Sequence, residues 1–231
     1  MKKAIITQSN YIPWKGYFDN INSVDLFIVF DDMQYTKRDW RNRNLIKTPN
    51  GTSWLTIPVE VRGKFFQKIN ETQISDPNWG DKHWGTIQSN YSKAPFFKHY
   101  KDVFEELYRT DLKFITDINI LFIRKINEIL GIKTEIIDSR EFDLIDGKTE
   151  RLVDLCVKND VSHYFTGPAA KNYMIEEMFE EKNIDITYFD YSNYPEYPQL
   201  YNEFSHAVTI LDMIFNLGEE TVNYMKSFDN K

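Results

Sequence analysis

The segment DDMQYTKRDWRNRN, residues 31–44, concentrates side chains that could carry chemistry. Its two acids, Asp31 and Asp32, could position an amine or bind Mg²⁺. Its bases could clamp a phosphate, since arginine can contact phosphate oxygens through two parallel hydrogen bonds. A solvated charged loop explains the same composition, but the segment directly follows a predicted buried strand. We therefore predict anion-binding residues here, which are Lys37, Arg38, Arg41 and Arg43, together with the aromatic side chain of Tyr35.

A second polar stretch, TQSNYIPWKGYFDNI over residues 7–21, follows the first predicted strand. Uncharged donors and acceptors and a proline interrupt an apolar run before a helix begins near Tyr17. A turn that satisfies its own backbone through Asn and Ser is the alternative interpretation. Because the charged segment follows the next strand of the same sheet, we interpret this stretch as one wall of a ligand site. The residues expected to line that wall are Gln8, Asn10, Tyr11 and Trp14.

A third stretch, YFTGPAAKNY at residues 164–173, passes from a predicted strand into a predicted helix through Gly167 and Pro168. Helix N-termini attract anions because their first N–H groups are free and the macrodipole is positive there. Lys171 would lie in the first turn, where a cation opposes the dipole. A phosphate partner explains this placement, and a lysine that extends into solvent explains it more simply. We predict that Gly167 and Lys171 contribute to ligand binding.

Of the four histidines, His83 is the best candidate for a general base, because histidine titrates near neutral pH. It lies between two tryptophans in NWGDKHWG, and a hydrogen-bonded structural histidine is the alternative interpretation. No two histidines have the spacing of a zinc site, so no metal is expected. The chain also lacks the GxSxG, GxxxxGK[ST] and GxGxxG motifs, which argues against common hydrolases, P-loop kinases and dinucleotide enzymes.

Apolar runs alternate with helical spacing at both ends of the chain. Near the start, predicted strands over 4–7 and 25–31 flank a predicted helix over 17–23. Such alternation is typical of a doubly wound parallel sheet, whose buried strands are continuous apolar runs. We therefore predict an α/β, Rossmann-like fold with a mainly parallel sheet. Later strands are predicted over 134–139, 162–167 and 184–191, with helices over 150–159 and 169–183.

Residues 32–130 interrupt this alternation and are predicted to form a long insertion. Its first part is loop- and hairpin-like, with an Asn-Gly turn between two strand candidates. Its second part has helical spacing in two segments over 96–131 and ends at Gly131, a natural helix cap. The tail begins as a Pro/Tyr-rich loop and ends as an apolar helix before Gly218. Because no repeat or linker is visible, we predict one domain, 1–231, with a helical C-terminal tail.

Composition limits the classes of function. The chain of 231 residues has 28 Lys and Arg against 35 Asp and Glu, a formal charge of −7, which gives no support to broad nucleic-acid binding. Its single cysteine, Cys156, falls on the apolar face of a predicted helix and is expected to be a core thiol. The start MKKAII lacks signal-peptide features, and no run approaches the roughly 18 apolar residues of a spanning helix. A cytoplasmic protein with no membrane partner is expected.

Five stretches, taken together and in order, resemble the WbqC-like family. They are QSNYIPWKGYFDNI, DDMQYTKRDWRNRNLIKTPNG, YSKAPFF, YFTGPAAKNYM and YPQLYNEFSHAVTILDMIFNLG, and they extend over most of the chain. Proline rather than Ser9 would be expected after Gln8, so this turn is less rigid than the family pattern. The resemblance implies a role in bacterial surface-polysaccharide biosynthesis, chiefly of O-antigen. For some members it implies transfer of glycine or another acyl group to the amine of a nucleotide-linked amino sugar.

The order of elements at the start of the chain is also similar to that of nucleotidylyltransferase-like folds, pantothenate synthetase among them. Those proteins place a phosphate-binding motif, often HxGH, between the first strand and its helix. The corresponding span here, YIPWKGY at residues 11–17, contains no histidine. The likeness supports a nucleotide-binding α/β fold, whereas the missing histidines argue against ordinary adenylyl transfer.

These observations lead to one hypothesis and two alternatives. The hypothesis is an N-acyl or aminoacyl transferase, such as a glycyltransferase, that acts on a nucleotide-linked amino-deoxysugar. The alternatives are a non-catalytic module that binds a sugar or nucleotide sugar, and an ATP-dependent amide ligase. The acyl donor is left open among acyl-CoA, amino acid plus ATP, and aminoacyl-tRNA, which would use the local basic patch at residues 37–43. No particular cofactor is indicated.

Amide formation needs a neutral amine, a base and donors for the developing oxyanion. In the hypothesis Asp31 or Asp32 orients the amine, and His83 accepts its proton. The bases of residues 31–44 hold the pyrophosphate. The remaining contacts to sugar or nucleotide base are expected from Gln8, Asn10, Tyr11, Trp14 and Tyr35.

Overall fold

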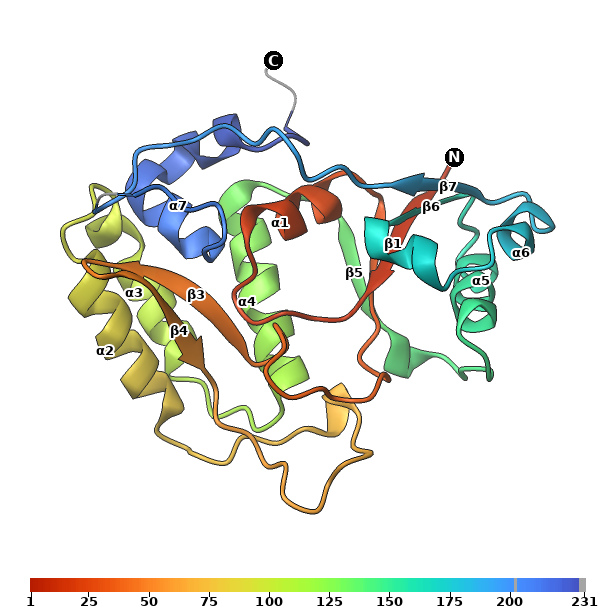
Figure 1. The fold of residues 1–231 in the computed structure, drawn as a ribbon, viewed down its shortest axis with the longest axis horizontal. Coiled ribbons are helices and arrows are strands. Elements are labelled where there is room, and N and C mark those ends of the chain that lie inside the picture. The colour runs from red at the N-terminus through yellow and green to blue at the C-terminus, as the bar shows by residue number, and fades with distance from the viewer. Residues whose placement is uncertain (202, 229–231) are drawn as a thin grey trace.

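Five parallel strands form the central sheet, in the order β5-β2-β1-β6-β7 (Figure 1). The computed structural model describes residues 1–201 and 203–228, and the rest of the predicted domain 1–231 lies outside them. From the central β1 the chain builds the sheet first to one side and then to the other, so the predicted doubly wound sheet is confirmed. The strands are β1 (Lys3–Thr7), β2 (Leu26–Val29), β5 (Glu135–Asp138), β6 (His163–Thr166) and β7 (Asp185–Tyr188).

Helices cover both faces of the sheet, because side chains along each strand alternate between two apolar clusters. Ile5 of β1 packs in one cluster, while its neighbours Ala4 and Ile6 pack in the other. The first cluster includes side chains of the helices that follow β1 and β2, and the second includes those that follow β5 and β6. The helices are α1 (Lys15–Asn22) and α4 (Ile115–Leu130) on the first face, and α5 (Thr149–Lys158) and α6 (Glu177–Glu180) on the second.

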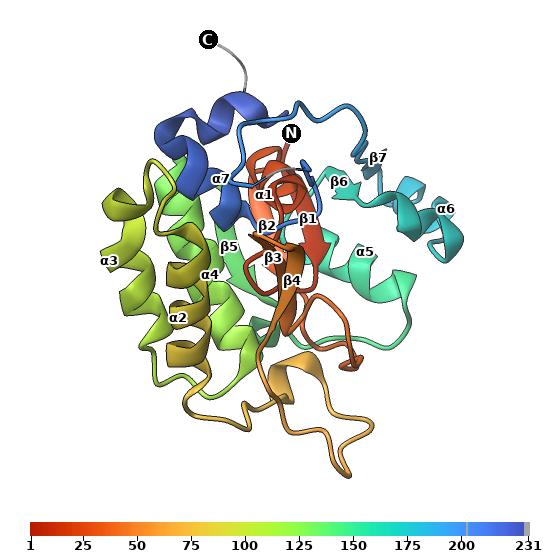
Figure 2. The same ribbon diagram turned by 60° about the vertical axis from the view of Figure 1, so that its left-hand side comes forward.

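Most of the predicted insertion forms additional structure outside the sheet (Figure 2). Its antiparallel hairpin has two loop residues between Thr48 and Gly51, which pair with each other. Helix α4, which closes the predicted range 32–130, is the crossover from β2 to β5, so only the residues before it are additional to the doubly wound pattern. The additional elements are β3 (Arg43–Thr48), β4 (Gly51–Thr56), α2 (Trp79–Tyr91) and α3 (Phe97–Tyr108).

Two helices differ from the sequence prediction. Helix α2 falls in the part expected to be loop- and hairpin-like. Its two glycines weaken the local helical signal. Buried side chains such as Trp79 and Trp84 hold the helix against the core. The single helix predicted over 169–183 is wrong. The structure contains a 3-10 helix, Pro168–Asn172, and then the short α6, because Met174 between them turns into the second apolar cluster.

The tail crosses the molecule as an irregular segment, forms α7 (Ile210–Leu217) as predicted, and continues as a 3-10 helix, Gly218–Tyr224. Asp212 of α7 is fully buried and accepts hydrogen bonds from the hydroxyls of Tyr91 (2.9 Å) and Tyr197 (2.7 Å). The bond from Tyr91 ties the tail to α2, and the bond from Tyr197 joins two parts of the tail. None of the helices that the structure describes has both the length and the apolar character needed to cross a bilayer.

We expect Gly131→Ala to lower the free energy of unfolding by about 1 kcal/mol, because a side chain is unfavourable in the left-handed conformation. Gly131 caps α4 at φ 74°, and no atom lies within 4 Å of a Cβ placed there, so the cost is that of the backbone alone. Gly85→Ala, at an equally open position inside α2, is the matched control and should raise the same free energy by about 0.5–1 kcal/mol. Urea unfolding measures the free energy of unfolding of both variants. Shifts of the same sign would contradict the left-handed conformation of Gly131.

Candidate functional site

Three cavities lie in a row at the edge of the sheet where the strands end, and we call this row the cleft. The basic cavity, of about 680 Å³, is named for Lys148 and Arg151 in its wall. The central cavity, of about 210 Å³, shares Thr7 and Gly167 with the basic cavity. The aromatic cavity, of about 310 Å³, shares Asn10, Trp14 and Trp40 with the central cavity.

The cleft lies at the switch point of the doubly wound sheet. Thr7 ends β1 and Thr166 ends β6, and these neighbouring strands continue into structure on opposite faces of the sheet. In open α/β sheets such divergence leaves a crevice outside the carboxyl ends of the strands, and ligands bind there. Position alone therefore makes the cleft the leading candidate for a ligand site.

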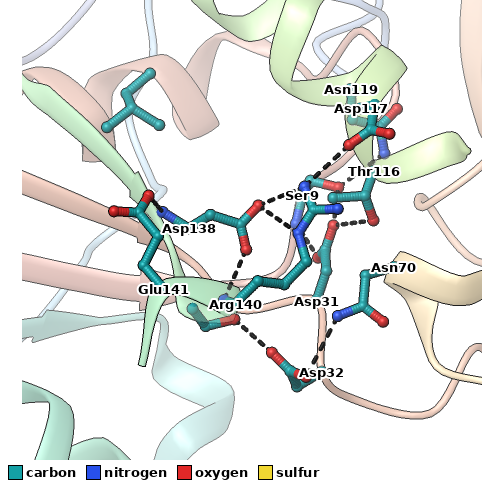
Figure 3. A network of polar contacts seen from close by, with 12 residues as sticks. Ser9, Asp31, Asp32, Asn70, Thr116, Asp117, Asn119, Asp138, Arg140 and Glu141 are labelled. Carbon is teal, nitrogen blue, oxygen red and sulfur yellow. Dashed lines mark hydrogen bonds and ion pairs between the residues drawn. The ribbon is translucent and has the colours of Figure 1, made fainter. Parts of the chain in front are cut away.

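A buried carboxylate holds the turn that follows β1 (Figure 3). Asp31 accepts hydrogen bonds from the backbone N–H of Ser9 (2.8 Å), from the Ser9 hydroxyl (2.6 Å) and from the Thr116 hydroxyl (2.7 Å). Burial raises the pKa of Asp31, and the bonds from Ser9 and Thr116 and the charge of Arg41 oppose that shift. Asn119 donates to both the Ser9 hydroxyl and the Arg41 carbonyl, each at 2.9 Å, which joins this turn to the loop after β2.

The same turn contains a strained residue. Ile12 has φ 36°, a value that a β-branched side chain rarely adopts. The Asn44 amide donates to the carbonyls of Tyr11 (3.1 Å) and Ile12 (2.9 Å), and the Tyr11 N–H donates to the Trp40 carbonyl (3.0 Å). These bonds hold the strained backbone in place, so the shape of the turn depends on the loop over residues 40–44.

Arg41 brings a positive charge into the central cavity. Its guanidinium donates to the side-chain oxygens of Asn10 and of Gln8, the latter at 3.1 Å, and to the Ser9 carbonyl at 3.4 Å. Because both amide oxygens are used by Arg41, the amide nitrogens of Gln8 and Asn10 are the groups left to donate to a ligand. The arrangement presents a cation beside two amide donors, which suits an anionic or hydroxylated molecule.

Aromatic side chains form the wall of the other end of the cleft. Trp14 packs edge-on against Tyr191 and Tyr194, with ring centroids 5.5 and 5.6 Å apart. Trp40 is 43% exposed and lies beside Trp54 at 5.3 Å. Such surfaces stack on sugars and planar bases.

His206 lies in the wall of the aromatic cavity. Its Nδ1 is buried and accepts no hydrogen bond from any residue that the structure describes. Burial lowers the pKa of His206, the nearby Lys15 lowers it further, and Glu196 acts in the opposite direction. The lowered pKa favours the neutral imidazole, and Nδ1 has no hydrogen-bond partner among the described residues.

The structure divides the residues predicted from the sequence into two groups. One group contributes to the walls of the cleft, and consists of Gln8, Asn10, Trp14, Arg41 and Gly167. The other group is absent from the walls of these three cavities, and consists of Tyr11, Asp31, Asp32, Tyr35, Lys37, Arg38, Arg43, His83 and Lys171.

His83 has the environment of a structural histidine. It is buried on α2, where Nδ1 accepts from the Tyr11 hydroxyl (2.8 Å) and Nε2–H donates to the Thr56 carbonyl (3.1 Å). Tyr11 is itself buried and shares a hydrogen bond of 2.9 Å with the Tyr108 hydroxyl. Since both ring nitrogens already have partners, His83 is poorly placed to take a proton from a substrate in the cleft.

The other charged candidates also have protein partners or lie in solvent. Asp32 accepts hydrogen bonds from Ser139 (2.7 Å), Lys68 (3.2 Å) and Asn70 (3.3 Å). Burial acts to raise the pKa of Asp32, but these bonds outweigh burial and lower the pKa. The Arg43 guanidinium stacks on Trp54 at 4.0 Å from the ring centroid. Tyr35 is buried, Lys37 and Arg38 are exposed, and Lys171 lies over the Tyr188 ring at 4.6 Å.

Several residues in the walls of the cleft escape sequence reasoning. Trp40 lies within the predicted charged segment and could have been chosen for its position. Tyr191 closes a predicted strand, where residues tend to reach the carboxyl edge, and His206 lies in one of the stretches that resemble the family. Arg151 lies in a predicted helix and has no local signal. Among the described residues no three His, Cys, Asp or Glu side chains gather in a way that could hold a metal. The missed residues are Asn20, Trp40, Lys148, Arg151, Thr166, Tyr173, Tyr191 and His206.

The state of His83 predicts how stability depends on pH. Burial lowers the pKa of His83 to about 4, so between that value and its unfolded pKa near 6.5 only the unfolded chain gains the proton. The free energy of unfolding should therefore fall as the pH is lowered through this window, by up to about 3 kcal/mol. Urea titrations of wild type and His83→Gln at several pH values measure the effect. A slope that is equally steep in both proteins would contradict it.

Comparison with known proteins identifies a relative and a family for this chain. The chain is 48% identical over 229 residues to "Uncharacterized protein Rv1507c" of Mycobacterium tuberculosis (strain ATCC 25618 / H37Rv), with 98% of each chain covered. No solved structure matches. The family model described as the WbqC-like protein family matches residues 8–224, which include both ends of the cleft. This chain therefore belongs to the WbqC-like protein family.

Proposed function

We propose that this chain binds a nucleotide-linked amino-deoxysugar along the cleft and transfers an acyl or aminoacyl group, such as glycyl, to the sugar amine. The product would serve bacterial surface-polysaccharide biosynthesis, O-antigen included, as the family resemblance implies. The observation that supports the proposal most is the series of cavities across the switch point, which combines cationic, amide and aromatic walls in one cleft.

The chemistry of each wall suits one part of such a substrate. A diphosphate needs cations, which the cleft offers in Arg41 and, in the basic cavity, in Lys148 and Arg151. Sugar hydroxyls need neutral donors, which Gln8 and Asn10 can supply. The apolar faces of Trp14 and Trp40 would pack against the sugar ring or the acyl chain.

His206 is the group in the cleft best suited to move a proton. In the proposed step the neutral sugar amine attacks the acyl carbonyl of a thioester or aminoacyl ester. A C–N bond forms, the bond from the carbonyl carbon to the leaving sulfur or oxygen breaks, and the proton of the attacking nitrogen passes to the His206 imidazole. His206 then returns this proton to the leaving group, so the base is regenerated.

Arg41→Ala should weaken binding of UDP- and dTDP-linked amino sugars by roughly 10- to 100-fold, because a charge-assisted hydrogen bond to the substrate is lost. Arg41→Lys retains the charge without the forked geometry and should give an intermediate affinity. The matched control is Arg109→Ala at the C-cap of α3, where the guanidinium pairs with Glu105 on an exposed surface. Calorimetric titration measures all four proteins. If wild type binds none of these sugars at millimolar concentration, the proposal fails.

Turnover tests the transfer itself. Wild type is given the bound sugar with acyl-CoA, with glycine plus ATP, or with glycyl-tRNA, and amide product is sought by mass spectrometry. His206→Gln should retain sugar affinity within about twofold and lose turnover by about 100-fold or more, because the glutamine amide cannot accept the proton. His163→Gln is the control, since His163 contacts Thr187 away from the walls of the cleft. Equal turnover by the His206 variant and wild type would show that His206 is not the general base.

A non-catalytic sugar-binding module is the second candidate. It is favoured by one observation, that Asp31, Asp32 and His83 are all engaged by protein groups. A module would bind the nucleotide sugar, give no amide with any donor, and bind equally well in wild type and His206→Gln.

A further inference from the structure

A protruding loop presents two adjacent phenylalanines to solvent. Phe65 is 75% exposed and Phe66 is 83% exposed, whereas the great majority of large apolar side chains in this chain are buried or half-buried. Residues 62–66 are all exposed and form the tip of the loop, which extends from the lower edge of the molecule in Figure 1. We call residues 62–66 the phenylalanine tip. The two rings contact each other edge to face, with centroids 5.0 Å apart.

The base of this loop is firmly attached to the body. Ile69 N–H donates to the Met33 carbonyl and Tyr35 N–H donates to the Gln67 carbonyl, both at 2.9 Å. The Gln34 amide donates to the Phe65 carbonyl at 2.8 Å. On the other side of the tip the Glu60 N–H donates to the Gln73 carbonyl at 2.9 Å. The backbone is therefore held at both sides of the tip, while the two rings remain mostly exposed.

Basic residues surround the phenylalanine tip although the whole chain carries a charge of −7. Arg62 and Lys64 lie within the tip and are exposed. Lys64 pairs with Glu60 at 2.5 Å, and Lys68 pairs with Asp32 at 3.2 Å.

We infer that the phenylalanine tip docks this protein on an anionic lipid surface. Aromatic rings bordered by Lys and Arg match the boundary between acyl chains and anionic headgroups, where rings are buried and cations meet phosphate. A projecting tip enters a fluid interface without needing a shaped partner, whereas a protein partner would have to supply a matching pocket. The inference is independent of the proposed reaction, because no residue of the tip belongs to the walls of the cleft.

Sedimentation with lipid vesicles tests this inference. Wild type should sediment with vesicles of mixed phosphatidylcholine and phosphatidylglycerol, and should bind them more weakly at high salt, because salt screens the attraction of the bases. Phe65→Ser/Phe66→Ser should weaken this binding at least about tenfold, because the buried apolar surface is lost. Vesicles of phosphatidylcholine alone should bind wild type less well than the mixed vesicles.

A matched variant controls for general loss of surface apolarity. Val157→Ser/Ile175→Ser removes two apolar side chains that are 50% and 49% exposed elsewhere on the surface, and it should sediment as wild type does. Urea unfolding of each variant should match wild type, which excludes a loss of folding as the cause. Where wild type binds the nucleotide sugar, titration of each variant should also match it, which excludes a change in the cleft.

Three results would overturn the inference. The first is that wild type remains in the supernatant with both kinds of vesicle. The second is that the Phe65→Ser/Phe66→Ser variant sediments as well as wild type does. The third is that wild type forms dimers that the variant does not form, with no vesicle binding by either, in which case the tip contacts a second copy of the chain.

Discussion

The buried carboxylate of Asp31 is the interaction on which the rest of the site depends. It joins the turn after β1, through Ser9, to the start of α4, through Thr116, while its own backbone continues from β2. Three segments that are far apart in the sequence thus meet at one buried anion. An unpaired charge in this position would be costly, so the three donors and the carboxylate require one another. This requirement fixes where Gln8 and Asn10 lie, and with them the guanidinium of Arg41.

The switch point of the sheet then converts this fixed corner into a cleft. The structures that follow β1 and β6 lie on opposite faces, and this divergence leaves a crevice outside these two strands. The walls of this crevice differ in chemistry from one end to the other. Lys148 and Arg151 lie at one end, Arg41 lies in the middle, and Trp14 and Trp40 lie at the other end. This order suits the nucleotide-linked sugar that we propose as the ligand, which has an anionic diphosphate and less polar parts.

Two histidines show how burial decides the use of a side chain. His83 has both nitrogens engaged, by Tyr11 and by the Thr56 carbonyl, and contributes to the packing between α2 and the hairpin. His206 has a buried Nδ1 without a partner among the described residues and is part of the wall of a cavity. Sequence reasoning favours His83, which lies between two tryptophans, although the tail around His206 is also rich in aromatic residues. The local sequence shows how many aromatic residues lie near a histidine. It does not show which ring nitrogen of that histidine lacks a hydrogen-bond partner.

The sequence by itself determined the doubly wound sheet, the hairpin and the end of α4 at Gly131, because strand period, helix period and glycine conformation act over a few residues. It also indicated that polar stretches follow β1, β2 and β6, and that these stretches would meet at one edge. Only the tertiary structure decided which side chains face the cleft. Asp31 turns inward, Arg41 reaches Asn10, and His206 arrives from the far end of the chain. In irregular segments the direction of a side chain is set by long-range hydrogen bonds and burial, which no local pattern contains.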